Sequence, residues 1–194
     1  MQICFASHNE NKVKEMNEIM PEGISIVGLK ELGVTNEIPE TGSTLEENSQ
    51  LKANYVFEKY AIPVFADDSG LLVNALNGEP GVYSARYAGS ERDDNKNMNL
   101  LLDRLSNHSD RSAEFKTVIT YIDQKGASKQ FKGIVNGIIA AEKRGSNGFG
   151  YDPIFQPSNY DETFAELTQT VKNQISHRAK AIYKLLEYLQ LNHG

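Results

Sequence analysis

The sequence contains little that would place it in a membrane, in an oxidising compartment or on DNA. Its 194 residues include a single cysteine, Cys4, which excludes an internal disulfide and favours a reducing compartment. No apolar run approaches the roughly 20 residues that span a bilayer, and the N-terminus lacks the basic and long apolar segments of a signal peptide. Asp and Glu number 26 against 20 Lys and Arg, so duplex DNA is not expected as the main partner. These features predict a cytoplasmic protein that engages neither a membrane nor a nucleic acid polymer.

Several common catalytic motifs are also missing. The chain has no GxxxxGK, no GxSxG and no well-placed GxGxxG, which argues against a P-loop, a hydrolase nucleophile elbow and a Rossmann site. His8, His108 and His193 lack the spacing of metal ligands. Cys4 lies in an apolar run and is therefore expected to be a buried structural thiol.

The hydrophobic pattern predicts an α/β protein with a mixed, twisted sheet. Helical periodicity is present from about residue 10 to 20, from Thr44 to before Pro63, over 94–105, and in a last helix that includes Ile175 and Leu189. Strands are expected at 2–6, 24–29, 64–66 and 71–76, and a hairpin at 113–123 and 128–141. No linker or repeat is evident, so 1–194 is read as one domain, with two lobes around a cleft.

The junction of the first strand and first helix is a candidate anion site. Its residues are Ser7, His8, Asn9, Glu10, Asn11 and Lys12. Ser and Asn can cap the helix, whose free N–H groups attract anions, and Lys12 adds a positive charge for a phosphate. The alternative is an ordinary helix cap with a solvated lysine.

Carboxylates gather in two further places. Asp67 and Asp68 follow the apolar run Val64–Ala66, as if at a strand end, where Asp-Asp-Ser-Gly could be a simple turn. Mg²⁺ is the other explanation, because it takes one or two carboxylates and completes its shell with waters and phosphates. Glu40 precedes a Thr-Gly turn and is the better second ligand, since Glu46 and Glu47 fit a role in the first turn of a helix.

Aromatic and basic residues near the C-terminus form a candidate base site. Gly148 and Gly150 flank Phe149, which we expect to be exposed so that a base-sized ring can stack on it. Lys172, His177 and Arg178 cluster at the start of the last helix. Cations there oppose the helix dipole, so they indicate an anionic or carbonyl ligand, with a solvated basic patch as the alternative.

Six motifs in order resemble the ITPase family of non-canonical purine nucleoside triphosphate pyrophosphatases (dITP/XTP pyrophosphatases). They are S-x-N-x-x-K at 7–12, E-T-G at 40–42, A-D-D-S-G at 66–70, G-x-P-G-V-Y-S-A-R-Y at 78–87, G-F-G-Y-D-P at 148–153 and K-x-x-I-S-H-R at 172–178. The match extends over the whole chain. His8 departs from the Gly or Asn often found in bacterial members.

The resemblance implies an elongated, two-lobed homodimer that uses Mg²⁺ to hydrolyse ITP, dITP and XTP to the monophosphate and pyrophosphate. It implies that 7–12 hold the triphosphate, that Glu40 and Asp68 bind the metal, and that Asp68 also activates water. Ser69 would contact the substrate. Base and sugar would be held by Phe149, Gly150, Tyr151, Asp152, Lys172, His177 and Arg178. A Maf-like pyrophosphatase with another base preference and a non-catalytic nucleotide-binding module are the alternatives.

Overall fold

The computed structural model describes residues 1–193, which form two compact units. Unit 1 comprises Met1–Asp68, Thr117–Lys132 and the segment that begins at Lys180. Unit 2 comprises Ser69–Lys116 and Gly133–Ala179. One domain with two lobes around a cleft stays a prediction.

Within residues 1–193, strands and helices alternate along the chain as far as Val73, and three strands and two helices follow Arg104. In order they are β1 (Gln2–Phe5), α1 (Glu10–Ile19), β2 (Ser25–Gly28), α2 (Leu45–Tyr60), β3 (Val64–Val73), η1 (Asn74–Leu76), η2 (Gly81–Arg86), α3 (Asp94–Arg104), β4 (Ser112–Ile122), β5 (Ser128–Ile139), β6 (Phe155–Pro157), α4 (Gln169–Ile175) and α5 (His177–His193). The strand order is β2-β1-β3-β4-β5-β6. β1 runs parallel to β2 and β3, whereas β5 and β6 are antiparallel, so the expected α/β class with a mixed sheet is confirmed.

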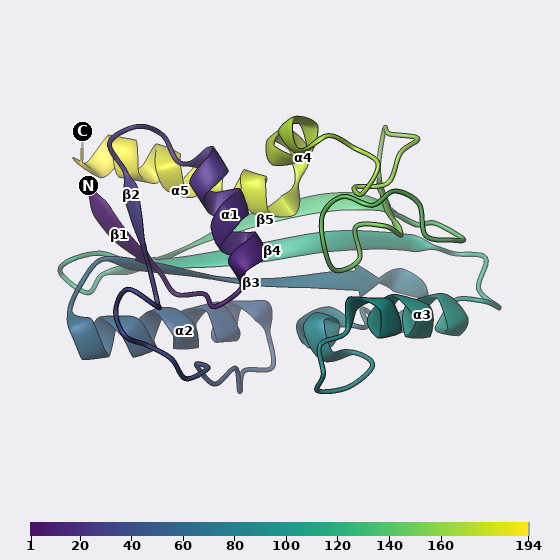
Figure 1. The fold of residues 1–194 in the computed structure, drawn as a ribbon, viewed down its shortest axis with the longest axis horizontal. Helices are drawn as coiled ribbons and strands as arrows, with labels where there is room; N and C mark the ends of the chain where they lie inside the picture. Colours follow the sequence, from purple (N-terminus) through teal and green to yellow (C-terminus); the bar gives the residue numbers. More distant parts are fainter. Residues whose placement is uncertain (194) are drawn as a thin grey trace. The chain divides into compact units, whose positions relative to one another are not determined.

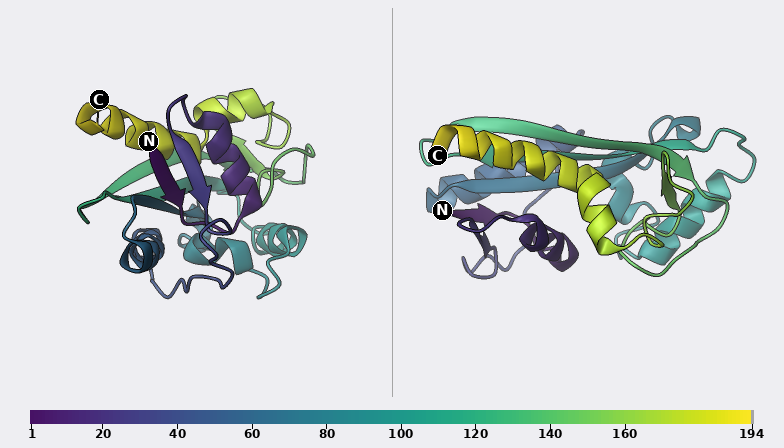
Figure 2. Two further views of the ribbon diagram at one scale, coloured as in Figure 1. Left: turned by 60° about the vertical axis from the view of Figure 1, so that its left-hand side comes forward. Right: turned by 90° about the horizontal axis from the view of Figure 1, so that it is seen from above.

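In unit 1, helices cover both faces of the sheet. α1 and α5 lie on one face and α2 on the other (Figures 1 and 2). One apolar cluster contains Met16 of α1, Phe65 of β3 and Ile182 of α5, while another contains Ala53 of α2 and Ala66 of β3. Successive side chains of a strand point to opposite faces, so odd positions of β3 face α1 and even positions face α2.

Cys4 belongs to the apolar cluster beneath α2. It is 1% exposed, and burial raises the pKa of its thiol from 9.0 to about 12. The prediction of a buried structural thiol is confirmed.

Unit 2 has a core of its own. Met98 and Leu101 of α3 belong to a cluster with Leu71 of β3, Phe115 of β4 and Phe155 of β6. Among residues 1–193, no helix is both long and apolar enough to cross a membrane.

Three predicted boundaries are wrong. The strand expected at 71–76 ends at Val73, and Asn74–Leu76 form the short 3₁₀ helix η1. Asp67 and Asp68 do not end a strand or form a turn, because β3 continues through both of them to Val73. The expected last helix is two helices: α4 ends at Ile175, Ser176 has extended backbone, and α5 begins at His177. The hydroxyl of Ser176 accepts a hydrogen bond from Ala179 N at 3.1 Å, as an N-cap does.

Candidate active site

The two adjacent aspartates of β3 have different lysine neighbours. Asp67, on the α1 face, is fully buried, and its Oδ2 lies 2.9 Å from Nζ of Lys12. Asp68, on the α2 face, has its Oδ1 3.8 Å from Nζ of Lys52. Strand alternation thus separates two carboxylates that are neighbours in the sequence. Lys12 is only 15% exposed in its side chain, so the alternative of a solvated lysine is wrong.

Glu40 joins Asp68 through Lys52. Nζ of Lys52 donates to Glu40 Oε1 at 2.5 Å, and the lysine side chain is 10% exposed. The turn after Glu40 is held against α2, because Gly42 N donates to Asn48 Oδ1 at 2.8 Å. A Cβ on Gly42 would lie 2.6 Å from Cβ of Glu47, so only glycine permits this close approach. The E-T-G motif therefore places a carboxylate beside Lys52.

Burial and charge shift the pKa values of this cluster. Desolvation raises the pKa of Asp68 above its usual value, although Lys52 and Lys12 act in the opposite direction. Desolvation alone would lower the pKa of Lys52, but the charges of Asp68, Asp67 and Glu40 outweigh it and the pKa is raised. Lys52 is therefore a charged ammonium held by carboxylates.

Glu40 and Asp68 can face a single cation, as their shared contact with one ammonium demonstrates. Mg²⁺ is commonly coordinated by one or two protein carboxylates when substrate phosphates and waters supply its other ligands. No group of three or more His, Cys, Asp or Glu in residues 1–193 is arranged to hold a metal ion by itself. Glu40 and Asp68 therefore fit a metal ion whose coordination is completed by a bound substrate and by water.

Glu46 and Glu47 are engaged elsewhere. Glu47 accepts from Ser43 N at 2.7 Å, and Thr44 caps α2 by accepting from Glu47 N at 3.1 Å. Glu46 pairs with Lys132 at 2.6 Å. Their interpretation as residues of a helix start is supported.

The Ser7–Lys12 segment caps α1 as expected. Asn9 is the N-cap, and its Oδ1 accepts from Lys12 N at 3.1 Å, while Ser7 Oγ accepts from Asn9 N at 3.2 Å. His8 Nε2 lies 3.1 Å from the carbonyl oxygen of Val34. Asn11 is exposed.

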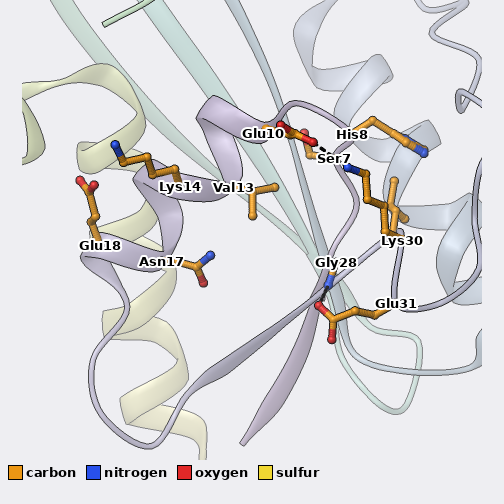
Figure 3. Close-up of a pocket in the computed structure, with 11 residues that line it drawn as sticks. Ser7, His8, Glu10, Val13, Lys14, Asn17, Glu18, Gly28, Lys30 and Glu31 are labelled. Carbon is orange, nitrogen blue, oxygen red and sulfur yellow. Dashed lines mark hydrogen bonds and ion pairs between the residues drawn. The ribbon is translucent and has the colours of Figure 1, made fainter. Parts of the chain in front are cut away.

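Part of this segment lines a pocket of about 550 Å³ that Figure 3 shows between α1 and the end of β2. Ser7, His8 and Glu10 contribute to its wall. Glu10 pairs with Lys30 at 2.6 Å, and both side chains are well exposed. Lys12 does not line this pocket but pairs with Asp67. Side chains of this segment thus point two ways: Ser7, His8 and Glu10 toward the pocket, and Lys12 toward Asp67 of β3.

In unit 2, Asp152 organises the glycine-rich loop. Its Oδ2 accepts from Nζ of Lys172 at 2.7 Å and from Phe149 N at 2.8 Å. Lys172 and Asp152 are 3% and 4% exposed in their side chains. Gly148 has φ +76°, and a Cβ there would lie 2.0 Å from Asp152 Oδ2, so glycine is required.

The remaining base-site residues surround Phe149 or lie near it in the chain. The Phe149 ring is half-buried rather than exposed, with Lys172 Nζ at 5.1 Å and the guanidinium carbon of Arg178 at 5.5 Å from its centroid. These are cation–π distances. Gly150 N donates to Asp94 Oδ2 at 2.7 Å, and the Tyr151 hydroxyl donates to a backbone carbonyl at 2.9 Å.

His177 and Arg178 are buried, at 4% and 3% exposure. The His177 ring stacks on Phe115, with 4.5 Å between centroids and 8° between planes. Arg178 Nη2 lies 3.4 Å from Ser69 Oγ. The alternative of a solvated basic patch is wrong, since the side chains of His177, Arg178 and Lys172 are buried in unit 2.

Sequence reasoning missed Lys52, Asn48 and Asp94. Lys52 and Asn48 are four residues apart on α2, so they lie on one face, and that spacing was a usable signal. Nothing in the sequence links Asp94 to Gly150, because the contact spans 56 residues.

A family model for the Ham1 family matches residues 3–188. The chain belongs to the Ham1 family. The dITP/XTP pyrophosphatase of Flavobacterium johnsoniae is 52% identical to this Ham1 chain over 97% of it and 98% of the relative.

Solved Ham1 structures share the fold. The Staphylococcus aureus Ham1 protein has a TM-score of 0.91 at 45% identity and covers 99% of this chain and 100% of its own. The Coxiella burnetii HAM1 protein has a TM-score of 0.91 at 41% identity, over 98% of this chain and 99% of its own. The family resemblance that the six motifs predict is confirmed.

Proposed function

We propose that this protein hydrolyses the non-canonical purine nucleoside triphosphates ITP, dITP and XTP to the monophosphate and pyrophosphate, with Mg²⁺ as cofactor. The similar protein of F. johnsoniae carries the name dITP/XTP pyrophosphatase. The observation that carries the proposal is the convergence of Glu40 and Asp68 on one cation, beside a second lysine–aspartate pair at the start of α1.

Glu40 and Asp68 would hold Mg²⁺. A divalent metal supplies positive charge that neutralises phosphate oxygens, which is the main requirement of phosphoryl transfer. Asp68 would also accept a proton from the water that attacks the α-phosphorus, and its raised pKa suits this role. Attack at the α-phosphorus releases pyrophosphate.

The start of α1 would bind the triphosphate. Ser7, Asn9 and the helix N–H groups offer hydrogen bonds to phosphate oxygens. Lys12 would add a charge that is already held in place by Asp67 at 2.9 Å. His8, Glu10 and Asn11 are proposed to contribute through their position in the same turn.

The base and sugar would be held by residues of unit 2. Phe149 offers a ring for stacking, while Arg178 and His177 offer donors to the 6-keto group of hypoxanthine or xanthine. Adenine carries an amino donor at that position, which would face another donor. Lys172 and Asp152 would fix the loop that includes Gly150 and Tyr151, and Ser69 would contact the substrate.

A product assay tests the proposal. ITP, XTP, ATP, dTTP and UTP are incubated with the protein and Mg²⁺, and pyrophosphate is resolved from orthophosphate. We expect pyrophosphate from ITP and XTP, its loss with a chelator, and little turnover of the other three. Preferred hydrolysis of dTTP or UTP would instead indicate a Maf-like enzyme, and nucleotide binding without turnover would indicate a binding module.

We also propose a homodimer, on the family resemblance. Light scattering at micromolar concentration should give about twice the monomer mass of 21.6 kDa. A mass equal to that of the monomer would contradict this proposal.

A further inference from the structure

We propose that Lys52 is a built-in counter-ion that takes the metal's place beside Glu40 and Asp68 in the nucleotide-free protein, so that a divalent metal binds there only by displacing its ammonium group. The inference rests on the proposed function, because it concerns the same two carboxylates. It assigns a role to a residue that the sequence motifs do not include.

The geometry puts Lys52 where a metal would bind. Its Nζ lies 2.5 Å from Glu40 Oε1 and 3.8 Å from Asp68 Oδ1. The stem comes from the middle of α2, and the residue is 8% exposed, so the ammonium group is enclosed beside these carboxylates. A buried ammonium persists in a protein only when carboxylates compensate it.

The close ion-pair contacts of the two lysines are to different carboxylates, although all these charges act on one another. Lys12 serves Asp67 on the face of the sheet that α1 covers. Lys52 serves the two carboxylates that the proposed metal also needs. An ammonium and a divalent metal within a few ångströms of each other repel strongly where water is scarce. Lys52 and the metal must therefore compete.

Lys52 and the metal act as two ligands that compete for one site, and Lys52 differs only in being part of the protein. The binding of one therefore lowers the affinity for the other. Couplings of this kind typically change affinity by about 5- to 150-fold. The free metal should therefore bind the nucleotide-free protein weakly. A metal that arrives with a triphosphate brings negative charge that offsets the released ammonium, so metal and nucleotide should enter together.

The experiment measures Mn²⁺ binding by the nucleotide-free protein, from the electron paramagnetic resonance signal of unbound Mn²⁺. The variants are Lys52→Met, Lys52→Arg and the double variant Lys52→Met/Glu40→Gln. Lys59→Met removes a charge from the exposed last turn of the same helix and is the matched control. We expect Lys52→Met to bind Mn²⁺ at least about tenfold more tightly than the wild type. Lys52→Arg and Lys59→Met should resemble the wild type, and the double variant should lose the gain.

An affinity in Lys52→Met that equals or falls below that of the wild type would overturn the inference. If that variant folds poorly, thermal melting with and without Mn²⁺ replaces the titration, with Lys52→Gln as a second variant. Mn²⁺ must then raise the melting temperature of the variants more than that of the wild type, and an equal shift refutes the competition.

Hydrolysis of ITP by the wild type is measured in parallel, so that the two proposals can fail separately. Turnover of ITP with no gain of Mn²⁺ affinity in Lys52→Met rejects the counter-ion role and keeps the proposed function. Tighter Mn²⁺ binding without turnover of ITP by the wild type rejects the proposed function and keeps the counter-ion role.

Discussion

Breaking the buried ion pair of unit 2 should cost a large fraction of the protein's stability. Lys172 Nζ lies 2.7 Å from Asp152 Oδ2, and both side chains are almost completely enclosed. At this distance, with an effective dielectric constant of about 20, the attraction is about 6 kcal/mol. Desolvation of the two ions offsets much of it, but removing one partner leaves an uncompensated charge and costs about 3–5 kcal/mol. Whole proteins are stable by only about 5–15 kcal/mol.

The perturbation is a double-mutant cycle with Lys172→Met and Asp152→Asn. The amide of Asn can still accept the hydrogen bond of Phe149 N, so Asp152→Asn removes mainly the charge. Each single variant should lose about 3–5 kcal/mol of unfolding free energy, because each removes the countercharge that lies 2.7 Å from the remaining buried charge. The double variant buries neither charge. Its loss of unfolding free energy should be about 3 kcal/mol smaller than the sum of the losses of the two single variants.

The assay is urea unfolding followed by circular dichroism and by fluorescence of the 9 tyrosines, since the chain has no tryptophan. Lys30→Met is the control, because Lys30 and Glu10 are 2.6 Å apart but 79% and 81% exposed, and it should cause no measurable loss. Strict additivity of the two single losses would refute the reasoning, since it would mean that Lys172 and Asp152 do not act as a pair.

Three further predictions concern the proposed chemistry. Asp68→Asn should retain less than about a tenth of the turnover of ITP, because it removes a metal ligand and a base. Lys12→Ala should weaken the binding of ITP far more than the binding of inosine, as measured by titration. Equal losses of affinity would mean that the Lys12 charge does not face the phosphates. Arg178→Ala should lower kcat/KM for ITP more than for ATP, because each lost polar contact is worth about 1–3 kcal/mol; parallel losses would assign base selection to other groups.

The sequence predicts those parts of the fold that local pattern determines. The cap of α1 at Asn9, the cap of α2 at Thr44 and the β4–β5 hairpin depend on neighbouring residues, and all three are found. The composition of Asp-Asp-Ser-Gly favours a turn, whereas β3 continues through these residues to Val73. What keeps Asp67 and Asp68 inside a strand is a lysine from each of two helices.

The candidate site shows the same limit. Motifs identified Glu40, Asp68 and Arg178, but not whether their side chains are buried or which groups they contact. No motif indicates Lys52, because a lysine in the middle of a helix is usually solvated. Its burial depends on carboxylates 12 and 16 residues away along the chain, at Glu40 and Asp68.

The single thiol beneath α2 makes this chain convenient for chemical labelling. Maleimides and similar reagents attack the thiolate, and Cys4, with 1% exposure and a pKa of about 12, presents almost none. A cysteine introduced at an exposed position, such as Lys125 in the β4–β5 turn, would then be the only reactive site in the folded protein. A fluorophore or spin label can therefore be attached at one chosen residue while Cys4 stays in place.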